Sequence, residues 1–174
     1  MFDTIMTIEV LGLGESLSEY KPNRNITIGV NDIHSRIKTN YVVCVDTFEP
    51  FTQERLNTIL NTKCCGFYTH LDCWKSVENY TEIKLHRLAE MDSELFRYSN
   101  NSPFVACVLA YKLGATRIVL WGVDMNNHHA LSKSNNFERA VKDYIKLKED
   151  LFNRGCELII GSEISALYKI LMNP

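Results

Sequence analysis

The chain has 174 residues, of which 45% are hydrophobic and 23% are charged, and its formal net charge is −2. This length and composition predict a single domain over residues 1–174 with a buried core. The negative charge argues against electrostatic capture of nucleic acid. No apolar stretch approaches the roughly 18 residues that a membrane-spanning helix needs.

Short apolar segments rich in β-branched residues alternate with helical patterns along the chain. The expected strands cover residues 4–11, 26–30, 41–45, 64–69, 117–121 and 156–160. Several are apolar on both faces, as is typical of parallel strands that helices cover on two sides. The alternation predicts an α/β, doubly wound, mainly parallel sheet flanked by helices.

The clearest helix has Ser102 as an N-cap candidate, Pro103 at its first position and Gly114 as its left-handed stop. Further helices are expected over residues 137–154, after Ser162, over 52–61 and in parts of 84–97. The polar stretch 71–101 is weakly periodic and reads as a long excursion over one end of the sheet, a candidate lid.

Six cysteines occur without a C-x-x-C pair. Four of them, Cys44, Cys65, Cys107 and Cys156, lie in or beside apolar segments, so we expect reduced core thiols and a cytoplasmic protein. A zinc site from Cys64, Cys65, Cys73 and His70 is disfavoured because the adjacent cysteines lack ligand spacing. The sequence therefore assigns no metal site.

The segment GLGESL, Gly12 to Leu17, follows the first apolar strand. It starts like the dinucleotide fingerprint G-x-G-x-x-G, but Leu17 stands at the third glycine, and a lone G-x-G is a weak signal. The segment is either a phosphate-binding turn or a tight turn that leaves a buried strand, and the residues around it must decide.

Polar residues follow every predicted strand. They are Gly12, Gly14, Glu15 and Ser16, then Asn31, Asp46, His70, Gly122 and Asp124, and finally Gly161 and Ser162. In a parallel sheet these positions share the carboxyl edge, where open α/β folds bind ligands. Helix starts at Ser16, Ser102 and Ser162 would offer N–H groups and hydroxyls to an anion. Polar strand ends occur in every α/β sheet, but the concentration of Gly, Asn and Asp favours a nucleotide site.

Two titratable features of this edge have more than one interpretation. His128 and His129 follow Asp124 in the segment NNHH, and they are either surface residues, a general base near neutral pH or metal ligands. Asp46 is either a contact to a ribose or metal, or a residue of a strand-end turn.

The stretch SPFVACVLAYKLGATRIVLWGVDM resembles bacterial sialyltransferases, in which a turn opens a helix and a strand then ends in Gly-Ile/Val-Asp. It is also similar to flagellin-glycosylation accessory proteins and to archaeal-type 6-hydroxymethylpterin diphosphokinases, which share a Rossmann-like sheet. The segments GLGESL, ITIGVND, YVVCVD and ELIIGSEISALYKIL resemble further motifs of these proteins, in the same order. The resemblance implies a Rossmann-like nucleotide-binding domain.

The resemblance to sialyltransferases also implies a role for each matching residue. Gly14, Glu15 and Ser16 would border the nucleotide phosphate, Asn31 would contact the donor, and Asn101 and Ser102 would face its carboxylate or phosphate end. Gly161, Ser162 and Ser165 would lie near the base and ribose. His128 or His129 would be the general base.

The implied activity is a glycosyltransferase that moves a sugar from a nucleotide-sugar to a glycan or other hydroxyl acceptor, with no cofactor required. The first alternative is a pterin-type diphosphokinase that uses ATP and Mg²⁺, with the metal on Asp46 or Asp124. The second is a non-catalytic nucleotide-binding domain. An open sheet edge also leaves room for a homo-oligomer, although no interface signature is visible.

Overall fold

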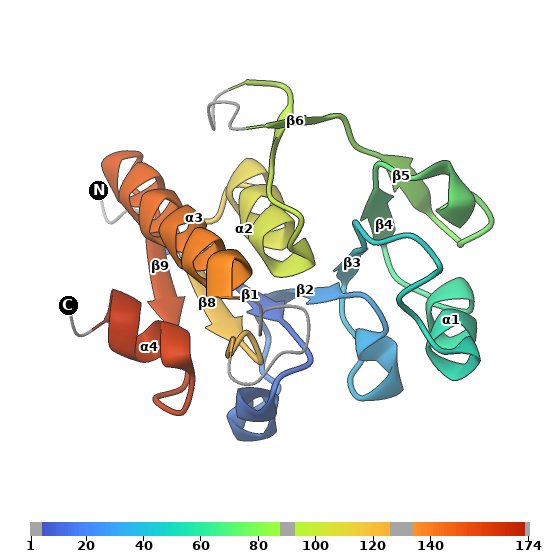
Figure 1. Cartoon of the computed structure of the whole chain (residues 1–174), viewed down its shortest axis with the longest axis horizontal. Coiled ribbons are helices and arrows are strands. Elements are labelled where there is room, and N and C mark those ends of the chain that lie inside the picture. The colour runs from blue at the N-terminus through green and yellow to red at the C-terminus, as the bar shows by residue number, and fades with distance from the viewer. Residues whose placement is uncertain (1–4, 88–92, 126–133, 173–174) are drawn as a thin grey trace.

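A seven-stranded sheet forms the centre of the protein (Figure 1). The computed structural model describes residues 5–87, 93–125 and 134–172. The strands lie in the order β5-β4-β3-β2-β1-β8-β9, and every neighbouring pair is parallel. Their bounds are β1 Thr7–Leu11, β2 Ile26–Val30, β3 Tyr41–Val43, β4 Gly66–Thr69, β5 Tyr80–Glu82, β8 Arg117–Trp121 and β9 Glu157–Ile160. The predicted α/β, doubly wound class is confirmed.

Helices cover the sheet on both faces, as the apolar strands require. One face carries the α-helices α2 (Ser102–Lys112), α3 (Ser134–Asn153) and α4 (Ala166–Leu171). The other face carries α1 (Gln53–Leu60) and the short 3₁₀ helices η1 (Glu15–Glu19), η2 (Ile33–Ser35) and η3 (Asp72–Trp74). Each face has its own apolar cluster, so the sheet separates two cores.

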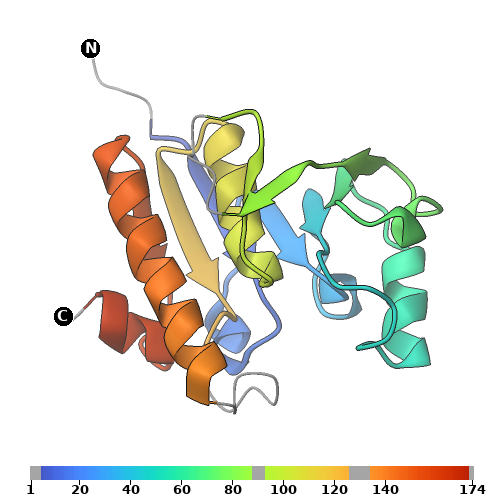
Figure 2. The same cartoon turned by 45° about the horizontal axis from the view of Figure 1, so that its top comes forward.

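Helix α2 is buried on nearly all sides, because it lies between the sheet and a second layer (Figure 2). Residues 104–110 are all buried, whereas a surface helix would show an exposed polar stripe. Strands β6 (Leu85–Arg87) and β7 (Phe96–Tyr98) pair in parallel to form a small ribbon of that outer layer. The ring of Phe104 on α2 also packs edge-on against Tyr144 of α3, with 5.8 Å between centroids.

In the described residues of 84–97 the expected helix is not found, since β6 and β7 occupy the two ends of that segment; residues 88–92 lie outside the described part of the chain. Each strand has only three residues, too few to show a period in the sequence. Their conformation depends on tertiary contacts: Leu85 and Phe96 pack against the core, and the buried Arg97 forms an ion pair with Asp150 of α3.

The excursion over residues 71–101 divides into two parts. Its first part adds η3 and the edge strand β5 to the main sheet. Its second part is fastened to α2 and α3: Lys112 Nζ donates to the Ser93 carbonyl at 2.5 Å, and Ser99 Oγ donates to Asp143 Oδ2 at 3.0 Å. The proposed role of this excursion as a lid stays a prediction.

Two helix starts differ from the prediction by a few residues. The N-cap of α2 is Asn101 rather than Ser102, because the Asn101 Oδ1 accepts from the Phe104 amide at 3.2 Å. The N-cap of α4 is Ser165, three residues beyond Ser162. The predicted left-handed stop after α2 is confirmed at Gly114, whose φ is +93°.

All six cysteines are free thiols, and Cys44, Cys107 and Cys156 are buried. Burial raises the pKa of Cys156 to about 11, which keeps the thiol protonated. The prediction of a core position for Cys65 is wrong: its side chain is exposed, because β4 begins one residue later. Within residues 5–87, 93–125 and 134–172, no helix has the length and apolar character to cross a bilayer.

Candidate functional site

A cleft of about 750 Å³ opens at the carboxyl edge of the sheet. Its walls come from the ends of β1, β2, β3 and β8, from the start of α2 and from one side of α3. The direction of chain winding reverses between β1 and β8, and open α/β sheets bind ligands at such a switch point. The predicted residues that line the cleft are Gly14, Glu15, Asn31, Asp46, Asn101, Ser102, Gly122 and Asp124.

Two turns meet where β1 and β8 end. The amide of Gly12 donates to the Trp121 carbonyl at 2.7 Å, and the amide of Gly14 donates to the Gly122 carbonyl at 2.7 Å. A Cβ atom on Gly12 would collide with the Gly122 carbonyl, and Gly122 itself has a φ of +65°. The two backbones can approach this closely only because both positions are glycine.

Ser16 and Asp124 fasten the same two turns through side chains. The Ser16 amide donates to Asp124 Oδ2 at 2.8 Å, and the Ser16 hydroxyl donates to Asp124 Oδ1. The Gly122 amide donates to Ser16 Oγ at 2.8 Å, so this hydroxyl both donates and accepts within the protein. Both side chains are buried. Asp124 therefore holds the floor of the cleft together, and a catalytic role for it stays a prediction.

These contacts answer the question raised by GLGESL. The amides of Gly12, Gly14, Ser16 and Leu17 all donate to acceptors of the protein itself. A phosphate-cradling turn needs such amides free to face the anion. The segment is a tight turn that forms part of the cleft wall, and these four amides are not available to a phosphate. The predicted place of Gly14, Glu15 and Ser16 beside the nucleotide phosphate stays a prediction.

A chain of polar side chains joins the ends of β2 and β3 to the start of α2. Ser102 Oγ donates to Asn31 Oδ1 at 3.1 Å, and Asn31 Nδ2 lies 3.4 Å from Asp46 Oδ2. Ser102 Oγ also accepts from the Val45 amide at 3.2 Å. Asn31 has a φ of +52°, a conformation that asparagine tolerates better than most residues. These contacts bring together three residues that the sequence predicted separately.

Asn101 connects the cleft to α3. Its Oδ1 accepts from the Tyr144 hydroxyl at 3.0 Å in addition to capping α2. Burial raises the pKa of Tyr144 well above its ordinary value, so the hydroxyl stays protonated and can donate. The Asn101 side chain is thereby held in one orientation.

The cleft also contains charged residues that the sequence analysis missed. Arg55 donates to Asp32 Oδ1 from Nη2 at 2.7 Å and from Nε at 3.0 Å, which pairs both charges. Arg36 Nη1 donates to the Leu13 carbonyl at 2.9 Å, and Arg139 lines the α3 side. Asp32 comes two residues after the end of β2, which was an available signal, but no spacing in the sequence relates the arginines to the edge.

The other predicted residues lie outside the cleft lining. Gly12 and Ser16 lie behind its floor, in the contacts between the two turns. Ser162 Oγ donates to Glu19 Oε2 at 2.6 Å, and Ser165 Oγ donates to the Val123 carbonyl at 3.1 Å. Gly161 lies so close to the Trp121 indole that a Cβ atom there would overlap the ring. Their contacts attach α4 to η1 and to the turn after β8.

The two candidate histidines, His128 and His129, lie outside the described residues. His70 at the end of β4 is described: burial lowers its pKa, and its ring lies 6.0 Å from that of Tyr98. It is not part of the cleft lining. Among residues 5–87, 93–125 and 134–172, no group of three or more His, Cys, Asp or Glu side chains could hold a metal.

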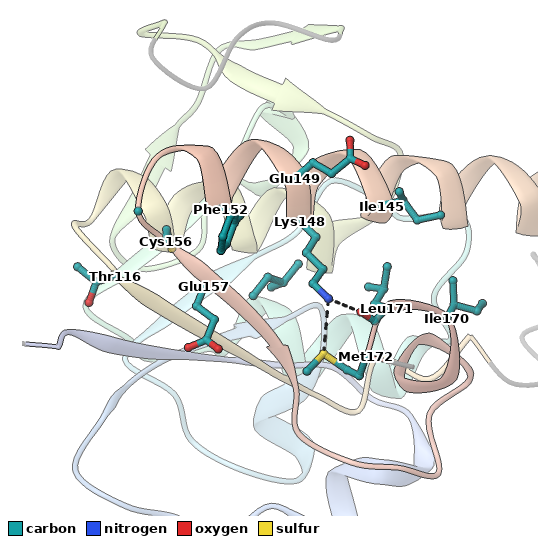
Figure 3. A pocket seen from close by; sticks show the side chains of 12 residues that line it. Thr116, Ile145, Lys148, Glu149, Phe152, Cys156, Glu157, Ile170, Leu171 and Met172 are labelled. Carbon is teal, nitrogen blue, oxygen red and sulfur yellow. Dashed lines mark hydrogen bonds between the residues drawn. The ribbon is translucent and has the colours of Figure 1, made fainter. Parts of the chain in front are cut away.

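A second hollow, of about 710 Å³, lies between α3, β9 and α4 (Figure 3). Ile145, Phe152, Leu171 and Met172 give it an apolar lining, and Lys148 Nζ donates across it to the Leu171 carbonyl. None of the residues predicted for the site lines this groove.

The fold and the cleft define a Rossmann-like α/β protein with its crevice at the switch point of the sheet. No protein-family model matches the chain, and no curated protein does so either. Solved structures do match. The sialyltransferase CstII from Campylobacter jejuni, in complex with the substrate analogue cytidine-5′-monophosphate, has a TM-score of 0.57 and 15% identity, covering 96% of this chain and 84% of that one.

Two further structures agree with this likeness. CST-II in complex with a trisaccharide acceptor and CMP has a TM-score of 0.54 and 14% identity, covering 95% of this chain and 84% of that one. The apo alpha-2,3-sialyltransferase from Campylobacter jejuni has a TM-score of 0.56 and 13% identity, and the match covers 96% of this chain and 79% of that one. At this identity the likeness establishes a shared fold. The resemblance to pterin diphosphokinases has no counterpart among these structures.

Proposed function

We propose that this protein is a glycosyltransferase that binds a nucleotide-activated sugar in the cleft at the carboxyl edge. The observation that carries the proposal is the chain of polar side chains Asn31, Ser102 and Asp46, beside Asn101, within a cleft of about 750 Å³. The fold around it is shared with sialyltransferases, one of which is described with CMP and a trisaccharide acceptor.

The cleft has the size and chemistry that a nucleotide-sugar needs. Small-molecule sites in proteins occupy about 300 to 1,000 Å³ and contain a few fixed polar groups. Asn31 and Ser102 fix each other's orientation, and Asn101 is held by Tyr144. Amide and hydroxyl groups held in this way can orient a sugar or ribose without having to reorganise.

In the proposed reaction, an acceptor hydroxyl oxygen attacks the anomeric carbon of the donor sugar. The bond from that carbon to the phosphate oxygen breaks, and its electron pair stays on the phosphate. The proton of the acceptor passes to a general base, which we assign on sequence grounds to His128 or His129. The proposal includes no metal cofactor.

No observation favours the Mg²⁺-dependent diphosphokinase alternative. Transfer of a diphosphate needs carboxylates that gather the cation. Of the two carboxylates that would hold it, Asp124 is bonded to Ser16 and Asp46 lies 3.4 Å from Asn31 Nδ2, and no metal-holding group is found in the described part of the chain. We therefore keep this alternative only as an outcome of the test.

The test is thermal unfolding with a panel of CMP, UDP, GDP, CMP-sialic acid, ATP and 6-hydroxymethylpterin, each with and without Mg²⁺. A ligand that binds only the folded state raises Tm. At a hundred times its Kd, the ligand adds about 2.7 kcal/mol to the free energy of unfolding. We expect a Mg²⁺-independent shift with a pyrimidine nucleotide. Ser102→Ala should reduce this shift, and the exposed Ser18→Ala should not.

Turnover is then measured as nucleotide release from CMP-sialic acid with and without a glycan acceptor. Loss of release in His128→Gln or His129→Gln, with the Tm shift retained, would identify the base. A Tm shift without any turnover would point to the non-catalytic nucleotide-binding domain. A shift that requires ATP and Mg²⁺, or no shift at all, would overturn the proposed function.

A further inference from the structure

The arginines of the cleft differ in whether a carboxylate pairs with their guanidinium. Arg55 is paired with Asp32 by two hydrogen bonds, and its guanidinium also lies 4.8 Å from the centre of the Phe51 ring. Arg36 is exposed and forms no ion pair with a carboxylate of the described residues. Arg36 therefore lines the cleft without a carboxylate partner at ion-pair distance among the described residues.

The position of Arg36 is fixed by the turn after β1. Its Nη1 donates at 2.9 Å to the carbonyl of Leu13, which lies 23 residues earlier in the chain. This bond holds the guanidinium beside Gly14, whereas its backbone lies just after η2 at the end of β2. A guanidinium has five N–H donors, so one hydrogen bond leaves most of them for a ligand.

Most amides of the turn are not available to a phosphate. The amides of Gly12, Gly14 and Ser16 donate within the protein, and the nearby Glu15 is an exposed carboxylate. An anion placed against this wall would meet repulsion from Glu15 unless a cation compensates it. Arg36 is the cation that the fold attaches to this turn.

We propose that Arg36 binds the phosphate of the nucleotide donor and stabilises the phosphate oxygens as the bond to the sugar breaks. This inference rests on the proposed function. As the carbon–oxygen bond breaks, its electron pair adds negative charge to the leaving phosphate. A planar guanidinium meets such oxygens with paired, charge-assisted hydrogen bonds, which strengthen as the charge develops.

The test is calorimetric titration of CMP and of cytidine into the protein and into Arg36→Gln, Arg36→Lys, Arg139→Gln and Arg24→Gln. Arg24 is an exposed arginine outside the cleft and serves as the matched control. We expect Arg36→Gln to weaken CMP binding about tenfold or more, because hydrogen bonds to charged groups are worth about that factor. Cytidine affinity should stay unchanged, Arg36→Lys should be intermediate, and Arg24→Gln should match the unaltered protein.

Unchanged CMP affinity in Arg36→Gln would overturn the inference while leaving the proposed function intact. An equal loss of CMP and cytidine would also overturn it, since the phosphate would then not be the group that is bound. If Arg139→Gln alone lost the higher affinity for CMP than for cytidine, the phosphate would be bound by Arg139 of α3 instead. If the unaltered protein binds no nucleotide, the proposed function fails and the role of Arg36 fails with it.

Discussion

Ser16 and Asp124 lie 108 residues apart in the chain, yet both the amide and the hydroxyl of Ser16 donate to the Asp124 carboxylate. The two residues connect the exit of β1 to the exit of β8, on either side of the switch point of the sheet. With the Gly12–Trp121 and Gly14–Gly122 backbone bonds they form the floor of the cleft. The geometry of the candidate site therefore depends on this contact.

Ser16→Ala should lower the free energy of unfolding by about 2 to 3 kcal/mol, because it leaves the buried Asp124 carboxylate and the Gly122 amide short of a partner. Urea unfolding measures the change. Ser18→Ala removes an exposed hydroxyl bonded only to the Glu15 carbonyl, and it should cost less than about 0.5 kcal/mol. Equal effects of the two substitutions would refute a structural role for Ser16.

Gly12→Ala should lower stability by about 3 kcal/mol, because a Cβ atom at that position overlaps the Gly122 carbonyl and forces the two turns apart. Gly155→Ala is the comparison: Gly155 has a φ of +75° but open space around it. That variant should cost only the left-handed strain of about 1 to 2 kcal/mol. Chemical denaturation measures the loss of stability in both variants. If Gly12→Ala loses no more stability than Gly155→Ala, the close approach of the two turns is contradicted.

Asn31 combines a left-handed backbone with two side-chain contacts, and paired substitutions separate these properties. Asn31→Gly and Asn31→Ala both lose the contacts to Ser102 and Asp46. Only alanine also bears the left-handed strain, so it should be less stable than the glycine variant by about 1 kcal/mol. Nucleotide affinity, measured by titration, should fall by a similar factor in both. Equal stability of the two variants would show that the backbone relaxes at this position.

Stability should fall as the pH drops below about 6.5, the ordinary pKa of histidine. Burial lowers the pKa of His34 in the folded protein, and the Thr39 amide donates to its Nε2 at 3.1 Å, which requires that nitrogen to be unprotonated. The unfolded chain therefore binds a proton more readily than the folded protein does. His34 contributes to the free energy of unfolding above its pKa in the unfolded chain, and this contribution is lost as the pH falls through its pKa in the folded protein. Urea unfolding between pH 8 and pH 5 should give a shallower dependence for His34→Gln. Parallel profiles would exclude His34 as the source.

The strands over residues 26–30 and 117–121 were predicted with their correct bounds, because apolar β-branched segments between polar turns carry a strong local signal. Asn31, Asp46 and Ser102 were predicted as separate edge residues, and the structure brings them together. The strands β6 and β7 were missed because three residues carry no period. Arg36 was missed because its contact to Leu13 depends on how two turns meet in space.

The sequence by itself determined the α/β class and the carboxyl edge as the candidate site. Both follow from local patterns: hydrophobic periodicity makes the strands and helices, and polar residues mark where each strand ends. Only the tertiary structure decided which polar groups are used internally and which face the cleft. Whether an amide, a carboxylate or a guanidinium is available to a ligand depends on partners that lie far away in the chain. This is why the sequence did not reveal that the amides of Gly12, Gly14, Ser16 and Leu17 are bonded within the protein, or that Arg36 lies beside this turn through its bond to the Leu13 carbonyl.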